Sequence, residues 1–313
     1  MKLIPNSKPA RLTAAAVAGV VLAGGPMVVS AQADQTLKEQ NPDGPPGIKA
    51  KGAFLGDGAG RNMYGKGADT PREMASTTKV MTASVVVGSG VDLDRKVTVQ
   101  KDYRDYVTKW GASTADLKTG DTLTVRQLLY GMLLPSGCDA AYALADTVGK
   151  GDTRTERIKS FIGMMNDKAK QLAMTHTQYD SFDGIEKQNQ NFSTPRDMAR
   201  LAKYALGKPH ISKVVKTETT KQKATNGRVY TWYNTNQLLG SYKGVIGIKT
   251  GSGTAAGDCL IFAARRDGHT LVGTILNSDK RYSDATKMLD WGFNEKSSTT
   301  IKLRKLPDGA QAD

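Results

Sequence analysis

The chain has 313 residues, of which 39% are hydrophobic and 24% are charged, and it carries a formal net charge of +14. This ordinary globular composition allows a real core in one large domain or two small ones. Two cysteines are too few for a disulfide-stapled scaffold. With only three histidines beside them, a zinc site with several His or Cys ligands has little support.

Residues 1–33 predict a secretory signal peptide. Three basic residues precede an apolar run over 12–30, and residues 31–33 (Ala-Gln-Ala) form a small-x-small cleavage pattern. The alternative is an uncleaved membrane anchor, but a Gly-Gly-Pro sequence at 24–26 interrupts the apolar run. We therefore expect export with cleavage after Ala33, to the extracellular space, the cell wall or the outer face of the cytoplasmic membrane.

The remaining chain carries a charge of +11, because its first 33 residues hold three basic residues and no acidic ones. An exported basic protein is attracted to anionic surfaces, so cell-wall polymers and anionic lipid head groups are candidate partners, whereas nucleic acid is not. The alternative is that the charge only provides solubility, because the basic residues are scattered without a dense run.

A polar, Pro/Gly-rich leader over 34–47 precedes the predicted elements. Periodicity and turn signals predict strands within 51–65 and at 96–99, 122–125, 229–233, 245–250, 260–265 and 270–276. They predict helices at 76–87, 126–134, 139–148, 155–173, 195–206 and 283–293. Because the strands lie at both ends and the helices in the middle, we expect an α+β fold with one antiparallel sheet, flanking helices and an inserted helical subdomain.

The first motif that carries chemistry is Ser76-Thr77-Thr78-Lys79, at the start of a predicted helix. Residues i and i+3 share a helix face, which places the Lys79 amine beside the Ser76 hydroxyl. Serine is a weak nucleophile until a base takes its proton, and a lysine with a lowered pKa can be that base. The motif is weak alone, but it occurs once in this chain.

The second motif is Ser136-Gly137-Cys138, a tight loop between two predicted helices. Asp139 follows it and would stabilise the start of the second helix. Taken alone, this segment fits an ordinary helix–loop–helix connection.

The third motif, Lys-Thr-Gly, occurs twice, at 118–120 and at 249–251. The earlier copy precedes an aspartate and a short strand, which is typical of a turn. The later copy ends an apolar strand and runs into Ser252-Gly253, where backbone can approach a ligand closely. We assign function to the later copy.

In this order, the three motifs resemble those of penicillin-recognising serine enzymes. Residues 74–82, 133–141, 192–199 and 244–251 are similar to low-molecular-mass D-alanyl-D-alanine carboxypeptidases, and the resemblance runs from about 48 to 293. It implies a penicillin-binding, serine β-lactamase-like fold: a single transpeptidase-like domain over 48–295, followed by a short tail over 296–313. It also implies peptidoglycan stem peptides as substrates and β-lactams as covalent inhibitors.

Cys138 departs from the family pattern, which has asparagine at this position. The replacement is similar to one found in a secreted actinomycete DD-transpeptidase. A thiol is a weaker donor and acceptor than an amide, so we expect a different hold on the substrate backbone. We expect Cys138 to line the cleft rather than to form a structural disulfide with Cys259. The disulfide is the alternative, because exported proteins meet oxidising conditions.

The resemblance implies a role for each motif residue, with no metal or organic cofactor. Ser76 attacks the carbonyl between the last two D-alanines, Lys79 takes its proton, and Ser136 relays a proton to the departing D-alanine. The substrate-binding residues would be Lys249, Thr250, Gly251, Ser252 and Cys138. Backbone N–H groups of Ser76 and Ser252 would form the oxyanion hole.

Two rival functions remain open. A β-lactamase would share the fold but needs an efficient deacylating base, such as the glutamate of an E-x-x-x-N pattern. The nearest stretch, 186–191, has Gln190 where that asparagine would be. A non-catalytic, basic wall-binding protein is the second rival, and the intact motif residues Ser76, Lys79, Ser136 and Lys249 argue against it.

Overall fold

The structure is a computed structural model that describes residues 44–45, 47–185, 190–295 and 301–311. The chain divides into two units at residues 39 and 40, and every described residue belongs to the second unit, 40–313. The predicted signal peptide over 1–33 and most of the leader lie outside the described residues. No helix of the described part is long and apolar enough to cross a membrane.

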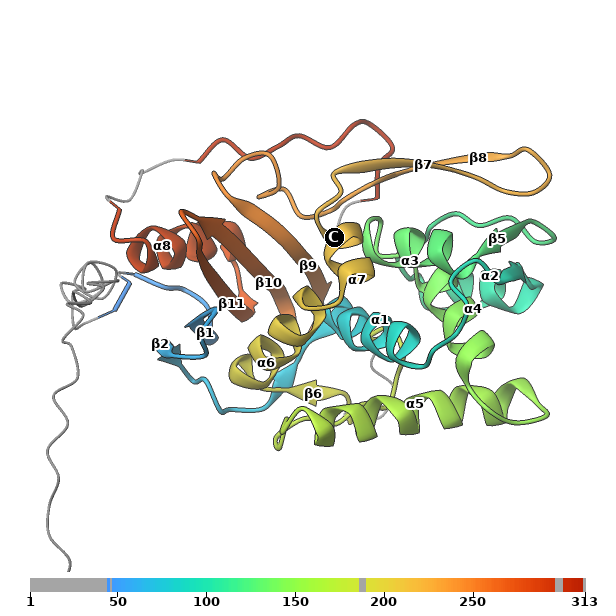
Figure 1. Cartoon of the computed structure of the whole chain (residues 1–313), viewed down its shortest axis with the longest axis horizontal. Helices are drawn as coiled ribbons and strands as arrows, with labels where there is room; N and C mark the ends of the chain where they lie inside the picture. The colour runs from blue at the N-terminus through green and yellow to red at the C-terminus, as the bar shows by residue number, and fades with distance from the viewer. Residues whose placement is uncertain (1–43, 46, 186–189, 296–300, 312–313) are drawn as a thin grey trace, which may run out of the picture. The chain divides into compact units, whose positions relative to one another are not determined.

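A five-stranded antiparallel sheet contains strands from both ends of the second unit (Figure 1). Its order is β2-β1-β11-β10-β9. The bounds are β1 Gly52–Asp57, β2 Asn62–Lys66, β9 Val245–Gly253, β10 Gly257–Arg266 and β11 His269–Ser278. The register of β1 on β11 runs from Gly52 opposite Leu276 to Asp57 opposite Leu271. The prediction of one sheet shared by the two ends is confirmed.

Alternating side chains of β10 divide the core into two halves. Ile261 and Ala263 face a large cluster that includes helix α6 (Pro195–Leu206). Phe262 and its neighbours on the other face pack against helix α8 (Arg281–Gly292). Successive residues of a strand point to opposite faces, so helices cover both faces of the sheet.

The helical subdomain lies between β2 and β9 in the sequence. It contains the 3-10 turn η1 Ala75–Thr78 and the helices α1 Lys79–Gly88, α2 Lys101–Trp110, α3 Val125–Leu133, α4 Cys138–Val148, α5 Arg154–Gln171 and α7 Pro209–Val215. Short strand pairs are β3 Arg72–Glu73 with β6 Phe192–Ser193, β4 Lys96–Thr98 with β5 Thr122–Thr124, and β7 Thr219–Lys223 with β8 Val229–Tyr233.

Local capping signals explain where several helices begin. The Thr194 side chain accepts from the backbone N–H of Asp197, and Pro195 occupies the first helical position, as the sequence predicts for α6. Thr153 and Glu156 form a capping box at the start of α5. The fold of the described residues is therefore α+β, with an inserted helical part.

Candidate active site

The side chains of Ser76 and Lys79 meet at the junction of η1 and α1. Lys79 Nζ lies 2.8 Å from Ser76 Oγ, in accordance with their i, i+3 spacing. The Lys79 side chain is fully buried, whereas Ser76 is half-buried. Lys79 Nζ also donates to the backbone carbonyl of Asp183, 2.9 Å away. The amine is therefore held between the hydroxyl and a carbonyl that is remote in sequence.

A tight loop over 181–184 packs against the backbone that precedes Ser76. Gly184 has φ +93°, and a Cβ at this position would lie 2.0 Å from the carbonyl oxygen of Ala75. Ala75 itself has φ +45°, which is uncommon for a residue other than glycine. Strained backbone of this kind clusters at functional sites. The turn that bears Ser76 is thus packed directly against a neighbouring loop.

The third motif contacts the turn that bears Ser76 from the other side. A Cβ on Gly251 of β9 would lie 2.9 Å from the backbone nitrogen of Ser76 and 3.0 Å from that of Thr77. Such contacts leave no room for a side chain, so glycine is needed for this approach. The strand end bearing Lys249-Thr250-Gly251 therefore lies directly against the backbone of Ser76.

Ser136 lies in the connection between α3 and α4. Its φ is +66°, again in the left-handed region, and its side chain is fully buried. Its Oγ has no hydrogen-bond partner among the described residues. A buried hydroxyl without a partner is costly in a stable protein and points to a ligand or a reaction role.

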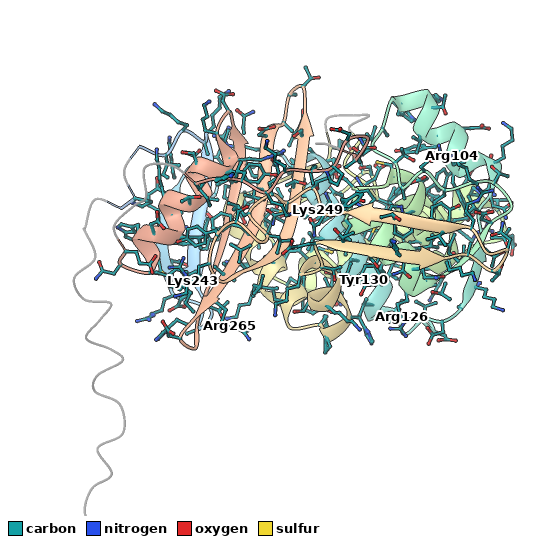
Figure 2. All side chains as sticks on the ribbon, turned by 90° about the horizontal axis from the view of Figure 1, so that it is seen from above. Arg104, Arg126, Tyr130, Lys243, Lys249 and Arg265 are labelled. Carbon is teal, nitrogen blue, oxygen red and sulfur yellow. The ribbon has the colours of Figure 1, made fainter. Side chains whose placement is uncertain are left out.

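Asp139 ties the connection bearing Ser136 to a second loop, over 113–117. Its carboxylate accepts from the backbone N–H of Ala115 at 2.8 Å and pairs with Arg104 at 2.6 Å. Gly137 packs closely against the same loop, because a Cβ there would lie 2.7 Å from the Ala115 nitrogen. Figure 2 shows Arg104 on the helical side of the molecule. The helical wall of the site is therefore a rigid, cross-linked pair of loops.

Lys249 and Thr250 are buried at the end of β9. Lys249 Nζ donates to the Thr250 carbonyl at 3.0 Å, and the Thr250 hydroxyl lies 2.6 Å from that of Thr235. Figure 2 shows Lys249 where the sheet meets the helical part. By contrast, Lys118 of the earlier Lys-Thr-Gly copy is 47% exposed and pairs with Asp116. The earlier copy forms a turn in which Gly120 has φ +89°.

Arg281, at the start of α8, completes the sheet side. Its guanidinium donates to the Gly251 carbonyl at 3.0 Å and to the exposed Ser252 hydroxyl at 2.8 Å. Ser252 Oγ also lies 2.9 Å from a carboxylate oxygen of Asp258. A positive group thus lies beside the third motif in addition to Lys249.

Both cysteines are free thiols and buried. The Cys138 side chain is 1% exposed, and burial raises the pKa of its thiol despite the opposing effect of Lys79 nearby. Burial likewise raises the pKa of Cys259 to about 12. The contact between Cys138 and substrate stays a prediction, but the thiol is not exposed to solvent in this conformation.

The sequence interpretation missed three residues of this site: Asp183, Thr235 and Arg281. Asp183 contributes a backbone carbonyl, which leaves no trace in residue type. Thr235 and Arg281 come from segments that lie 15 and 30 residues from their partners Thr250 and Gly251. The Ser76, Lys79, Lys249, Thr250, Gly251 and Ser252 positions are brought together through η1, α1 and β9.

Comparison with family models matches residues 35–280 to D-alanyl-D-alanine carboxypeptidase. The D-alanyl-D-alanine carboxypeptidase of Streptomyces sp. strain K15 is 50% identical over 79% of this chain and 88% of its own length. DacB2 of Mycobacterium tuberculosis is 32% identical over 80% of this chain and 84% of its own length. DacC of Escherichia coli is 34% identical over 79% of this chain and 62% of its own length.

Solved structures give the same result. The crystal structure of the Streptomyces K15 DD-transpeptidase superposes with a TM-score of 0.77 and 51% identity, covering 80% of this chain and 98% of that one. A D-alanyl-D-alanine carboxypeptidase from M. tuberculosis superposes with a TM-score of 0.73 and 27% identity, covering 86% of this chain and 98% of that one. The resemblance read from the motifs is confirmed: the chain belongs to the D-alanyl-D-alanine carboxypeptidase family, with the penicillin-binding DD-peptidase fold.

Proposed function

We propose that this serine DD-peptidase cleaves the bond between the last two D-alanines of peptidoglycan stem peptides through an acyl-enzyme on Ser76. Family membership supports the reaction class. The observation that carries the assignment of the nucleophile is the 2.8 Å contact between Ser76 Oγ and Lys79 Nζ. Ser76 is half-buried, so a substrate can reach it from solvent, whereas the fully buried Lys79 side chain is shielded from solvent.

Acylation begins when the Lys79 amine takes the proton of Ser76 Oγ. The oxygen forms a bond to the penultimate D-alanine carbonyl carbon, and the C=O electron pair moves onto its oxygen. When that pair returns, the C–N bond breaks and the leaving nitrogen takes a proton. Ser136 is suited to relay this proton from Lys79, because its buried Oγ has no partner among the described residues.

Positive groups and hydroxyls at the end of β9 would hold the terminal carboxylate of the substrate. Lys249 supplies a buried charge, Thr250 a hydroxyl, and Arg281 a guanidinium beside Gly251 and Ser252. The backbone N–H groups of Ser76 and Ser252 would stabilise the oxyanion. The close packing of Gly251 on the Ser76 nitrogen supports this arrangement, since it brings the two segments together.

The acyl-enzyme would be resolved by water, which gives a carboxypeptidase, or by an amine of a second peptide, which gives a transpeptidase. Strained β-lactams would acylate Ser76 in place of the peptide. Because stem peptides lie outside the cytoplasm, the reaction requires export, for which the predicted signal peptide over 1–33 provides the route. Anionic wall polymers or lipid head groups would attract the basic mature chain.

A product assay tests the proposed reaction. The enzyme is incubated with an acyl peptide that ends in D-Ala-D-Ala, with and without a glycine-type amine. Release of one D-alanine is expected in both cases, and a shift from the hydrolysed to the transferred product with added amine measures the transpeptidase share. No release of D-alanine by a folded enzyme would contradict the proposal.

The β-lactamase alternative is separated by the lifetime of a penicillin label. A DD-peptidase keeps the label on Ser76, whereas a β-lactamase turns it over rapidly. Glu186, the glutamate considered for that role, lies outside the described residues. Asn191 is described, and its amide donates to Thr78. A label that persists after gel filtration supports the DD-peptidase.

A further inference from the structure

We propose that segment 301–311, which we call the strap, closes one end of the substrate cleft and restrains acylation until it is displaced. The strap follows α8 and lies beyond residue 280, where the family match ends. Figure 1 shows it in red, running from the side of α8 toward α3. It therefore lies outside the part of the chain that the family match covers.

One anchor of the strap is Arg304. Its guanidinium donates to the carbonyl oxygens of Asn234 at 2.5 Å, Asn236 at 3.2 Å and Leu239 at 3.1 Å. Its backbone N–H donates to Ser241 Oγ at 2.6 Å. The side chain is only 17% exposed. Because one half-buried arginine makes several hydrogen bonds here, the contact is specific and well anchored.

The loop that receives Arg304 is part of the sheet wall of the active site. Thr235 in that loop contacts the Thr250 hydroxyl at 2.6 Å, and its backbone N–H donates to the carbonyl of Leu134, two residues before Ser136. The residues that Arg304 contacts thus flank Thr235, which touches the third motif at Thr250 and the chain just before the second motif at Leu134.

The second anchor is Gln311, whose side-chain oxygen accepts from the backbone N–H of Thr114 at 3.1 Å. Ser113 O, beside it, accepts from the backbone N–H of Cys138 at 2.8 Å. Asp139 holds the same loop. The strap thus reaches the helical wall directly beside the Ser136-Gly137-Cys138 motif.

Between the anchors, the strap crosses from the sheet wall to the helical wall. Seven peptide units reach about 25 Å at most, and a turn in which the Ala310 N–H donates to the Pro307 carbonyl shortens this span further. Leu306 and Ala310 are half-buried, whereas Lys305 is exposed. The strap therefore joins the loop that contacts Thr250 to the loop that contacts Cys138, and from these two anchors we place it across the end of the cleft through which the C-terminal end of a peptide substrate would pass.

The test of this inference rests on the proposed acylation of Ser76 for one of its two readouts. Arg304→Ala in the full chain removes the guanidinium contacts of the first anchor. Lys305→Ala is the control, because it removes the same charge from an exposed neighbour. A chain that stops after Leu303 is the second variant, since it keeps the strap residues Ile301 and Leu303, which pack on the core. Thermal unfolding of each variant verifies that it is folded.

The first readout is the rate of labelling by a fluorescent penicillin. If the strap is closed in most molecules, Arg304→Ala and the chain ending at 303 acylate about threefold to tenfold faster than the full chain, and Lys305→Ala acylates at the original rate. Folded variants that acylate at the original rate, or more slowly, overturn the inference.

The second readout does not depend on chemistry at Ser76. Hydrogen exchange of the backbone N–H groups over 113–117 is compared between the full chain and the chain ending at 303. Faster exchange at Thr114 in the shorter chain supports the strap contact, and unchanged exchange overturns it. If no variant is labelled by penicillin but exchange changes, the proposed function fails and the contact stands.

Discussion

The backbone nitrogen of Ser76 lies 2.9 Å from the place that a Cβ on Gly251 would occupy. The turn that bears Ser76 and the end of β9, 175 residues apart in the chain, are therefore in direct contact through backbone. This contact sets how far the third motif stands from Ser76, and its consequences can be measured.

Gly251→Ala is expected to slow penicillin acylation of Ser76 by roughly a hundredfold, because the added methyl forces β9 away from the oxyanion hole. Gly253→Ala is the matched control, since a Cβ there would meet Ala256 at an ordinary 3.5 Å. It should leave the rate nearly unchanged. Stopped-flow measurement of labelling compares the two, and equal rates would show that the close approach has no role.

Lys249→Ala is expected to lower the acylation rate by about a hundredfold, the loss typical of removing one stabilising electrostatic group. Lys118→Ala should change it little, because Lys118 pairs with Asp116 on the surface. The same labelling assay compares both variants. A large loss at Lys118 with none at Lys249 would assign the function to the other copy of the motif.

Cys138 should react slowly with an alkylating reagent in the native protein at neutral pH. Its pKa is raised by burial, so the reactive thiolate is scarce, and the thiol is also 1% exposed. Because the pKa of the folded thiol is raised, the alkylation rate of the native protein keeps rising with pH beyond the ordinary thiol pKa. The alkylation rate of the unfolded protein levels off near that pKa. Alkylation followed by peptide mass spectrometry gives both profiles.

Cys138→Asn provides a second check, because it restores the residue that the family pattern has there. It should still acylate. Recovery of a linked Cys138–Cys259 peptide from the native protein would contradict the free thiols described above.

Sequence reasoning predicted those features that arise from local pattern. Thr194 and Pro195 mark the start of α6 because capping depends on adjacent residues alone. The spacing of Ser76 and Lys79 predicted their contact because i and i+3 share a helix face. Strands at both chain ends predicted the shared sheet because apolar alternation leaves each one needing partners.

Features that depend on tertiary contacts could not be predicted. Helix α2 was missed because its sequence is polar, with only Tyr103 and Val107 buried on it. The short helix α7, which begins at Pro209, and strand β7 were also missed. The Asp183 carbonyl that accepts from Lys79 lies 104 residues away in the chain. Every residue has a backbone carbonyl, so residue type cannot predict this partner. Such partners are selected by packing, which pattern reasoning does not reach.

Ser76 is the proposed covalent nucleophile, and intact-mass and peptide mass spectrometry after penicillin treatment test this role most directly. We expect one adduct per chain, carried by the peptide that contains Ser76, and none on a folded Ser76→Ala variant. An adduct on Cys138, or an adduct that persists in Ser76→Ala, would contradict it.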